Sequence, residues 1–195
     1  CPEVTLELLC SDLAGDLDAL AMLLDGAPLR VFAHNVECVP RLDRTVRDHR
    51  ASFEQSLAVL REARRLRPDL LIKTSIMVGL GERDEEILEA MAMVREAGVD
   101  LITLGQYLAP SAAHLPVDRY PEPSMFQTWA DQAIGLGFLG VASGPLVRSS
   151  FKAGLLLRAC TEKDWDGEMP GATVRVRRGA AADRHPHRST SGGEA

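Results

Sequence analysis

Asn35 and Glu37 are the first residues along the chain whose types and spacing suggest ligand binding. They follow an apolar run and alternate with Val36, so both side chains point to one side of an extended strand end. An amide and a carboxylate placed in this way can bind the two hydroxyl groups of a ribose, as acidic residues do in nucleotide-binding folds. The alternative is that both groups bond to neighbouring loops. His34 faces the opposite way, where it serves either as a structural histidine or as a ligand.

Lys73, Thr74 and Ser75 form a second polar group, within a run that is otherwise Leu-Leu-Ile and Ile-Met-Val. A lysine buried on both faces of a sheet needs a charge partner or a cavity to line. In a barrel the cavity explanation is natural, with a substrate carboxylate as the partner. Gly79 and Gly81, just after the run, allow the backbone to approach a cofactor closely. We expect Glu82 to anchor their loop.

Gln106 and the segment Arg148–Ser150 complete the set of candidate residues. Gln106 follows the fourth apolar run, where a parallel sheet presents its site residues. Arg148 can stabilise negative charge on a substrate, since its guanidinium stays charged. Considered by itself, Arg-Ser-Ser followed by Phe151 is also typical of an ordinary helix start, in which a serine caps the first turn.

The elements that must position these residues alternate between short apolar runs and amphipathic segments. Ser52, with Gln55 three residues later, predicts a capping box at the start of one helix. Strand–helix alternation with short connections predicts right-handed βαβ units and a parallel sheet, with the polar residues at the carboxyl ends of its strands. The expected strands cover residues 4–9, 31–33, 70–78, 101–104 and 138–142, and the expected helices cover 17–26, 53–66, 84–98 and 126–137.

The composition is that of a soluble globular domain, with 195 residues, 46% hydrophobic residues and a net charge of −6. An acidic chain argues against nucleic acid or an anionic membrane surface as partner, and no stretch approaches the ~18 apolar residues of a membrane span. The four cysteines lie far apart, which predicts neither a zinc site nor a disulfide framework and fits a reducing cytoplasm. We expect one domain over residues 1–159 and a disordered tail over residues 160–195, which lack apolar periodicity.

Four segments, taken together, are more specific than composition. They are HNVE (34–37), KTSIMVGLGE (73–82), GQYLAPSAAHLPVDRY (105–120) and SGPLVRSSF (143–151). In order and spacing they resemble the C-terminal two-thirds of the lipoyl synthase family, which belongs to the radical S-adenosylmethionine superfamily. The resemblance covers residues 3–158. The chain departs from the family pattern at Cys38, at Thr74–Ser75 and at Phe151.

The resemblance implies an α/β fold: a partial (β/α)6 TIM-type barrel that lacks its first strands in this chain. It also implies S-adenosylmethionine and two [4Fe–4S] clusters as cofactors, with the two cysteine triads lying N-terminal to this sequence. The family inserts two sulfur atoms at C6 and C8 of a protein-bound octanoyl chain. The implied partners are an octanoylated lipoyl-carrier domain or H protein and an electron donor such as flavodoxin or ferredoxin, with no nucleic acid and no membrane.

Roles for individual residues follow from the resemblance. Arg148 and Ser150 are the implied catalytic residues, and Ser150 is the implied non-cysteine ligand of the auxiliary cluster. A serine oxygen is a poorer partner than a thiolate in iron–sulfur chemistry, so it can leave readily when the cluster gives up sulfide. The implied cofactor-binding residues are Asn35, Glu37, Lys73, Ser75, Gly79, Gly81, Glu82 and Gln106.

Because no cysteine triad is present, we expect the chain to be part of a longer enzyme and to be inactive alone. Two other interpretations stay open. One is a barrel enzyme without clusters that binds a phosphorylated small molecule. The other is a degenerate, non-catalytic chain that acts only as a binding module.

Overall fold

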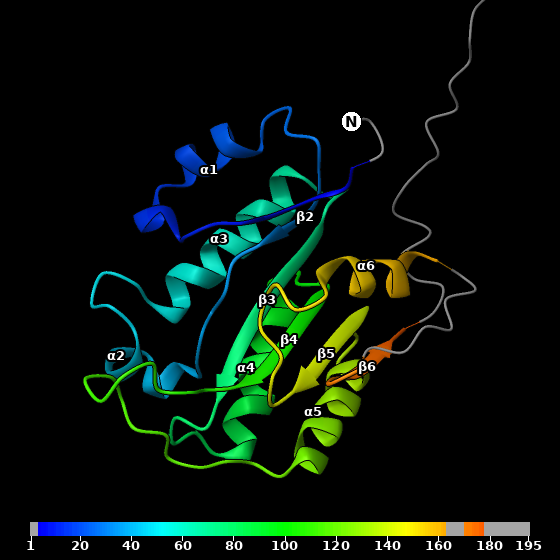
Figure 1. The fold of residues 1–195 in the computed structure, drawn as a ribbon. Helices are drawn as coiled ribbons and strands as arrows, with labels where there is room; N and C mark the ends of the chain where they lie inside the picture. Colours follow the sequence, from blue (N-terminus) through cyan, green and yellow to red (C-terminus); the bar gives the residue numbers. More distant parts are fainter. Residues whose placement is uncertain (1–3, 163–169, 178–195) are drawn as a thin grey trace, which may run out of the picture.

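Strands and helices alternate along the chain, as the apolar pattern predicts (Figure 1). The computed structural model describes residues 4–162 and 170–177. The strands are β1 (Leu6–Leu9), β2 (Leu29–Ala33), β3 (Leu71–Val78), β4 (Leu101–Gln106), β5 (Gly140–Gly144) and β6 (Thr173–Val176). The helices are α1 (Leu17–Leu24), α2 (Asp43–Val46), α3 (Phe53–Leu66), α4 (Asp84–Glu96), α5 (Pro123–Gly135) and α6 (Ala153–Thr161), with short 3-10 turns η1 (Leu13–Gly15) and η2 (Pro40–Leu42).

All six strands join one sheet in the order of the chain, from β1 to β6. The first five are parallel, and β6 pairs antiparallel with β5. The predicted α/β class and the parallel sheet are therefore confirmed. Among the described residues β1 and β6 are the two edges of this sheet, at opposite sides in Figure 1, so the barrel itself stays a prediction.

The alternation of side chains along each strand divides the core into two layers. One face of the sheet packs against the helices α1, α3, α4 and α5, with Phe32, Ile72 and Trp129 among its fully buried residues. On the opposite face, Leu71 packs with Leu156 of α6. Lys73 and Ser75 share the face of Leu71, because they follow it at a spacing of two. They therefore lie on the side of the sheet away from the four helices.

Ser52 begins α3 as predicted, since its Oγ accepts a hydrogen bond from the backbone N–H of Gln55 at 3.1 Å. The helix ends at Leu66, ahead of Pro68, which cannot continue it. The Gln55 side chain does not complete the predicted box. It donates instead to Asp12 Oδ2 at 2.7 Å, which ties α3 to the loop after β1.

The predicted disordered tail is wrong where the structure describes it. Helix α6 continues to Thr161, and β6 pairs with β5, with Val174 opposite Ala142. The four residues of β6 are too short for periodicity to reveal, and the strand is stabilised by covering an edge of β5 that would otherwise leave backbone groups unpaired. The rest of the predicted tail, residues 163–169 and 178–195, lies outside the described residues.

Candidate functional site

The carboxyl ends of the strands meet at one edge of the sheet, and two cavities open there. The Asn35 cavity, of about 340 Å³, is lined by Leu9, Cys10, Ser11, Asp12, His34, Asn35, Glu37, Arg47 and Ala51. The Gln106 cavity, of about 500 Å³, is lined by Thr45, Val46, Met77, Leu80, Gln106, Tyr107, Leu108, Pro110, Ala113, His114, Leu115 and Arg148. Parallel α/β proteins place their ligands at this edge, so both cavities are candidate sites.

Asn35 and Glu37 line the same cavity, as predicted. The Asn35 side chain lies close enough to the Glu37 carboxyl group to lower its pKa, against the larger effect of burial. Its carbonyl oxygen Oδ1 is buried and has no hydrogen-bond partner within the described chain. A buried acceptor without a partner is costly, so this atom is suited to a ligand that donates a hydrogen bond.

Glu37 has an unusual backbone, with a left-handed φ of 67°. Its N–H donates to the carbonyl of Ser75 at 3.2 Å, and its carbonyl accepts from the N–H of Met77 at 2.8 Å, so β3 holds the turn in place. A non-glycine residue in this region costs about 1–3 kcal/mol, and such strain clusters at functional sites. Strain and an unpartnered oxygen thus fall on neighbouring residues of one cavity.

The environment of Glu37 contains opposing influences on its charge. Burial raises the pKa of the Glu37 carboxyl most strongly, while the Asn35 amide and the Arg47 guanidinium lower that pKa. The net direction is upward. The Asn35 amide and the Arg47 guanidinium therefore offset part, but not all, of the effect of burial on this pKa.

His34 is a structural histidine. Its Nδ1 lies 3.0 Å from the carbonyl oxygen of Cys10, and its Nε2 lies 2.8 Å from the Oγ of Ser56. Burial is the main cause that lowers the pKa of its ring. With both nitrogens bonded within the chain, the structural interpretation of His34 is favoured over the ligand interpretation.

The charge partner of Lys73 differs from the predicted one, which was a substrate carboxylate. Its Nζ lies 2.6 Å from Oε1 of Glu7 on β1, and its side chain is 2% exposed. The charge partner is thus a carboxylate of the chain and not that of a substrate. In the described part of the chain Lys73 is not among the residues that line the cavity of Asn35 and Glu37, and its cofactor-binding role stays a prediction. Ser75 is also buried, and its Oγ lies 3.4 Å from the carbonyl of Thr103.

Glu82 anchors the loop after β3, as predicted. Its two oxygens accept from the backbone N–H groups of Gly79 at 2.7 Å and Leu80 at 2.8 Å. A Cβ at Gly79 would meet the amide nitrogen of Gln106 and lie 2.6 Å from the carbonyl of Arg119. The backbone at Gly79 is therefore closely approached by Gln106 and Arg119 of the chain itself, where the prediction was a cofactor. Gly81 has a φ of 100°, and a Cβ at this position would lie 3.7 Å from the side chain of Asp118. The cofactor-binding roles of these residues stay predictions.

Gln106 and Arg148 come together in the second cavity. The Gln106 amide donates to the carbonyls of Tyr107 at 2.9 Å and Arg119 at 3.1 Å. Arg148 is exposed, and its guanidinium donates to the carbonyls of Val147 at 2.6 Å and Pro145 at 3.4 Å. Arg148 thus supplies a positive charge at a cavity whose other lining groups are mainly apolar.

Ser150 is exposed on the turn before α6. The helix N-cap is Lys152, in a left-handed conformation, so the alternative that Ser150 caps this helix is wrong. Across residues 4–162 and 170–177, no group of three His, Cys, Asp or Glu side chains is placed to hold a metal ion. The described residues therefore do not by themselves fit an iron–sulfur cluster, which requires several thiolates.

Sequence reasoning missed Arg47 as a site residue. Its side chain is 7% exposed, lines the Asn35 cavity, and donates from Nη2 to Ser56 Oγ at 3.0 Å. No local pattern identifies it, because the surrounding segment is rich in charged residues. Only the fold brings it beside Glu37.

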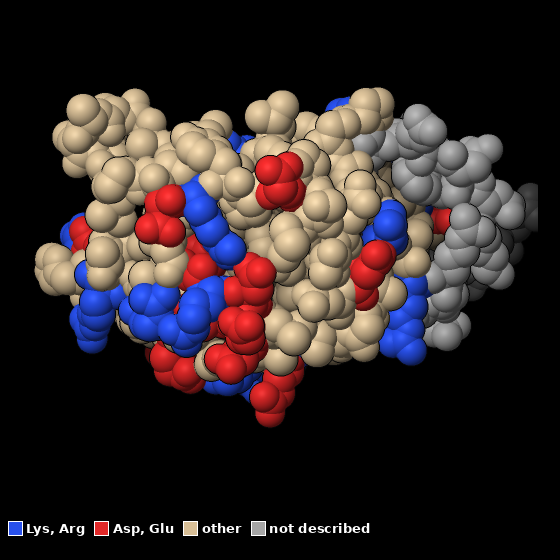
Figure 2. All heavy atoms as spheres, turned by 90° about the horizontal axis from the view of Figure 1, so that it is seen from below, with Lys and Arg blue, Asp and Glu red and all other residues tan. Residues whose placement is uncertain are grey.

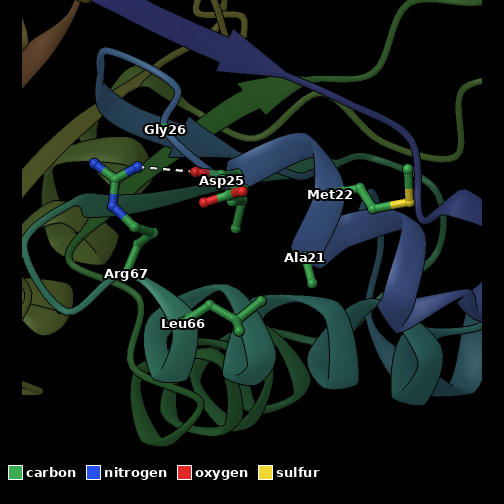
Figure 3. A pocket seen from close by; sticks show the side chains of 7 residues that line it. Ala21, Met22, Asp25, Gly26, Leu66 and Arg67 are labelled. Carbon is green, nitrogen blue, oxygen red and sulfur yellow. Dashed lines mark hydrogen bonds between the residues drawn. The ribbon is translucent and has the colours of Figure 1, made fainter.

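A third cavity, of about 420 Å³, lies away from this edge between α1 and α3 (Figure 3). Arg67 dominates its polar lining, and the dashed line marks the hydrogen bond that it donates to the carbonyl of Leu24 at 3.0 Å. The same guanidinium also donates to Ala27 O and to Asp69. Because the chain itself uses these donors, this cavity does not point to a ligand.

Charges on the face seen from below are intermixed rather than gathered by sign (Figure 2). Ion pairs account for part of this arrangement, such as Arg41–Glu86 at 2.7 Å and Arg119–Asp84 at 2.7 Å. Nucleic-acid-binding proteins present a one-sided basic surface, which this face lacks. No helix in the described part of the chain is long and apolar enough to cross a bilayer.

Fold and site together define an α/β protein with a mostly parallel sheet and a candidate ligand site at the carboxyl ends of its strands. The chain is a homologue of the lipoyl synthases. It is 52% identical over 155 residues to "Lipoyl synthase 2, chloroplastic" of Zea mays, and 53% identical over 151 residues to "Lipoyl synthase, mitochondrial" of Xenopus laevis. The predicted resemblance is confirmed. No family model matches the chain.

These alignments cover 80% and 77% of this chain, but only 42% and 40% of the two relatives. "Lipoyl synthase" of Sorangium cellulosum is 46% identical over 196 residues, covering 93% of this chain and 51% of the relative. The chain thus spans about half or less of the length of these relatives. The Sorangium match also extends beyond residues 3–158, so the predicted extent of the resemblance was too short. The names of the other two relatives refer to chloroplasts and mitochondria, so the predicted cytoplasmic location stays a prediction.

Proposed function

We propose that this chain is part of a lipoyl synthase with a TIM-type barrel. Its substrate is an octanoyl chain carried on a lipoyl-carrier domain or H protein, and the reaction inserts two sulfur atoms, at C6 and C8. Identity of about 50% to proteins named lipoyl synthase supports this proposal. The observation that carries it furthest within the chain is the unpartnered, buried Oδ1 of Asn35 beside the Glu37 carboxylate.

These two residues fit the ribose of S-adenosylmethionine. A ribose presents two neighbouring hydroxyl donors, and the Asn35 carbonyl and the Glu37 carboxylate are two acceptors on one wall of a cavity. The left-handed backbone of Glu37 turns the chain at this point. Asn35 and Glu37 would therefore bind and orient the cofactor, which supplies the radical chemistry of the reaction when bound.

The Gln106 cavity is lined by Thr45 and Val46, and the next residue, Arg47, lines the Asn35 cavity. The apolar lining of the Gln106 cavity suits an aliphatic chain and excludes water, which protects reactive species from side reactions. Arg148 would stabilise negative charge at this cavity, as its implied catalytic role requires. An external electron donor such as flavodoxin or ferredoxin completes the proposal.

Of the ligands implied for the two [4Fe–4S] clusters, the described residues supply only Ser150, whose hydroxyl is a single oxygen donor, so they do not by themselves hold a cluster. Ser150 would act as a ligand in the complete enzyme, with its exposed position on the turn before α6 leaving the hydroxyl accessible.

A chimeric enzyme tests this proposal. Residues 4–162 of this chain replace the matching part of the Sorangium relative, and S-adenosylmethionine cleavage and lipoyl product are measured under anaerobic, reducing conditions. We expect the chimera to make lipoyl product. In the chimera, Ser150→Ala should retain S-adenosylmethionine cleavage but stop sulfur insertion. The neighbouring Ser149→Ala should leave both cleavage and sulfur insertion unchanged. Normal lipoyl product from Ser150→Ala would contradict the ligand role, and a chimera that folds, binds its clusters and makes no product would contradict the function.

A further inference from the structure

Arg47 is the buried cation of the Asn35 cavity. It follows directly on α2, where its backbone N–H donates to the carbonyl of Asp43 at 2.9 Å. Its side chain is 7% exposed. Because an arginine does not lose its proton in proteins, burial here fixes a positive charge in the cavity wall.

Two helices set the position of this guanidinium. Nη2 donates to Oγ of Ser56 on α3 at 3.0 Å, and Nη1 lies 3.6 Å from Oδ1 of Asp43 on α2. Asp43 is itself fixed, since its Oδ2 accepts from the backbone N–H of Phe53 at 2.8 Å. Because the guanidinium is already held by contacts with both helices, it loses little further conformational freedom when it donates another hydrogen bond.

The third contact of Arg47 reaches the site. Nη1 donates to the carbonyl of Val36 at 3.5 Å, and that carbonyl belongs to the peptide joining Val36 to Glu37. This is the peptide whose orientation depends on the left-handed φ of Glu37. Strained backbone persists only where its surroundings hold it, and Arg47 is part of those surroundings.

We propose that Arg47 is a positioning residue of the Asn35 cavity: it braces the Val36–Glu37 peptide and places a permanent positive charge beside the Glu37 side chain. The inference rests on the proposed function, because a diol needs an acceptor at Glu37 and a protonated carboxyl gives up part of its acceptor capacity. The action of Arg47 is indirect, through Glu37.

The charges around Glu37 favour this role. The other titratable groups at this cavity or beside Cys38 come from the loops after β1, β2 and β3 and from α2, and they are Cys10, Asp12, His34, Cys38, Asp43 and Glu82. Burial lowers the pKa of His34 and raises the pKa of both thiols, and a carboxyl group carries no positive charge in either protonation state. Arg47 lowers the pKa of Glu37 against the effect of burial. Among the described residues lining this cavity, Arg47 is the permanent cation.

The test follows the titration of Glu37 in the ligand-free chain, with ¹³C-labelled glutamate observed by NMR. Arg47→Met should shift the titration midpoint of Glu37 upward, and Arg47→Lys, which keeps a charge, should shift it less. Arg44→Met is the matched control, because Arg44 is an exposed residue of α2, the helix that Arg47 directly follows, and it should leave the midpoint unchanged. Lysine rescue separates a charge effect from a merely structural one.

A folded Arg47→Met chain with the wild-type midpoint would overturn the proposal, as would an equal shift in Arg44→Met. If Arg47→Met does not fold, Arg47→Gln, which keeps a donor toward the Val36 carbonyl, takes its place with the same expected shift. The measurement uses no ligand. The inference about Arg47 can therefore fail while the proposed function stands, and the proposed function can fail while the inference about Arg47 stands.

Discussion

The ammonium of Lys73 on β3 lies 2.6 Å from the carboxylate of Glu7 on β1, although β2 separates the two strands in the sheet. The two side chains are unequally buried, with 2% of Lys73 and 22% of Glu7 exposed. The pair spans β2 and ties the edge strand to the centre of the sheet.

This asymmetry predicts which partner is costlier to remove. Glu7→Gln leaves a buried ammonium without its counter-charge and should lower the free energy of unfolding by about 3–5 kcal/mol. Lys73→Met should cost less, because methionine fills the apolar site and the remaining Glu7 carboxylate reaches water. Urea unfolding of both variants and of the double variant checks this, with the double variant expected to resemble Lys73→Met. A larger loss for Lys73→Met than for Glu7→Gln would contradict it.

Gly79 should tolerate alanine far less well than Gly26. Both have positive φ, 98° and 62°, so alanine costs each about 1–3 kcal/mol in backbone strain. A Cβ at Gly26, which lies at the cavity of Figure 3, meets nothing within 4 Å. A Cβ at Gly79 meets Gln106 and the carbonyl of Arg119, which adds about 1–3 kcal/mol of overpacking. Equal melting temperatures for the two variants would show that the loop after β3 yields to the extra atom.

His34 should make the fold sensitive to acid. Burial lowers its pKa below 6.5, so the folded chain prefers the neutral ring. The unfolded chain therefore binds a proton more readily, and the contribution of His34 to stability is fully present above pH 6.5 and is lost as the pH falls through the lower folded pKa. Unfolding free energies at several pH values should fall less steeply toward acid in His34→Gln than in wild type. His49→Gln, at an exposed histidine, should keep the wild-type slope, and a wild-type slope in His34→Gln would contradict the account.

Cys10 should react slowly with iodoacetamide despite lining the Asn35 cavity. Burial, with Asp12 adding to it, raises the pKa of the Cys10 thiol to about 11, so little thiolate is present at neutral pH. Mass spectrometry of the alkylated chain at increasing pH should show Cys10 labelling accelerating up to that range. Rapid labelling at pH 7 would mean that the cavity is more open to water than the structure indicates.

The sequence predicts the elements well where long apolar runs and caps coincide. The strand at 70–78 and the Ser52 cap have strong local signals, and both are present in the structure. β6 has only four residues and gains its stability from pairing with β5, which no local pattern can reveal.

The site residues could likewise be predicted where the signal is local, and not where it depends on tertiary contacts. Asn35 and Glu37 share a cavity because strand alternation alone places them on one side. The partner of Lys73 was missed because Glu7 is distant in sequence and meets it only across the sheet. Arg47 was missed because its role depends on α2 and α3 holding it near the Val36 carbonyl. Contacts that depend on tertiary structure leave no spacing to detect.

Titration of the chain with S-adenosylhomocysteine, followed by calorimetry, tests the central claim most directly. The account predicts saturable binding that weakens about tenfold or more in Glu37→Gln and in Asn35→Ala, the effect of losing a hydrogen bond of about 1.5–3 kcal/mol involving a charged group. Glu54→Gln, at an exposed carboxylate on α3, should bind as wild type does. Wild-type affinity in Glu37→Gln, or no saturable binding by the folded wild-type chain, would contradict the assignment of this cavity.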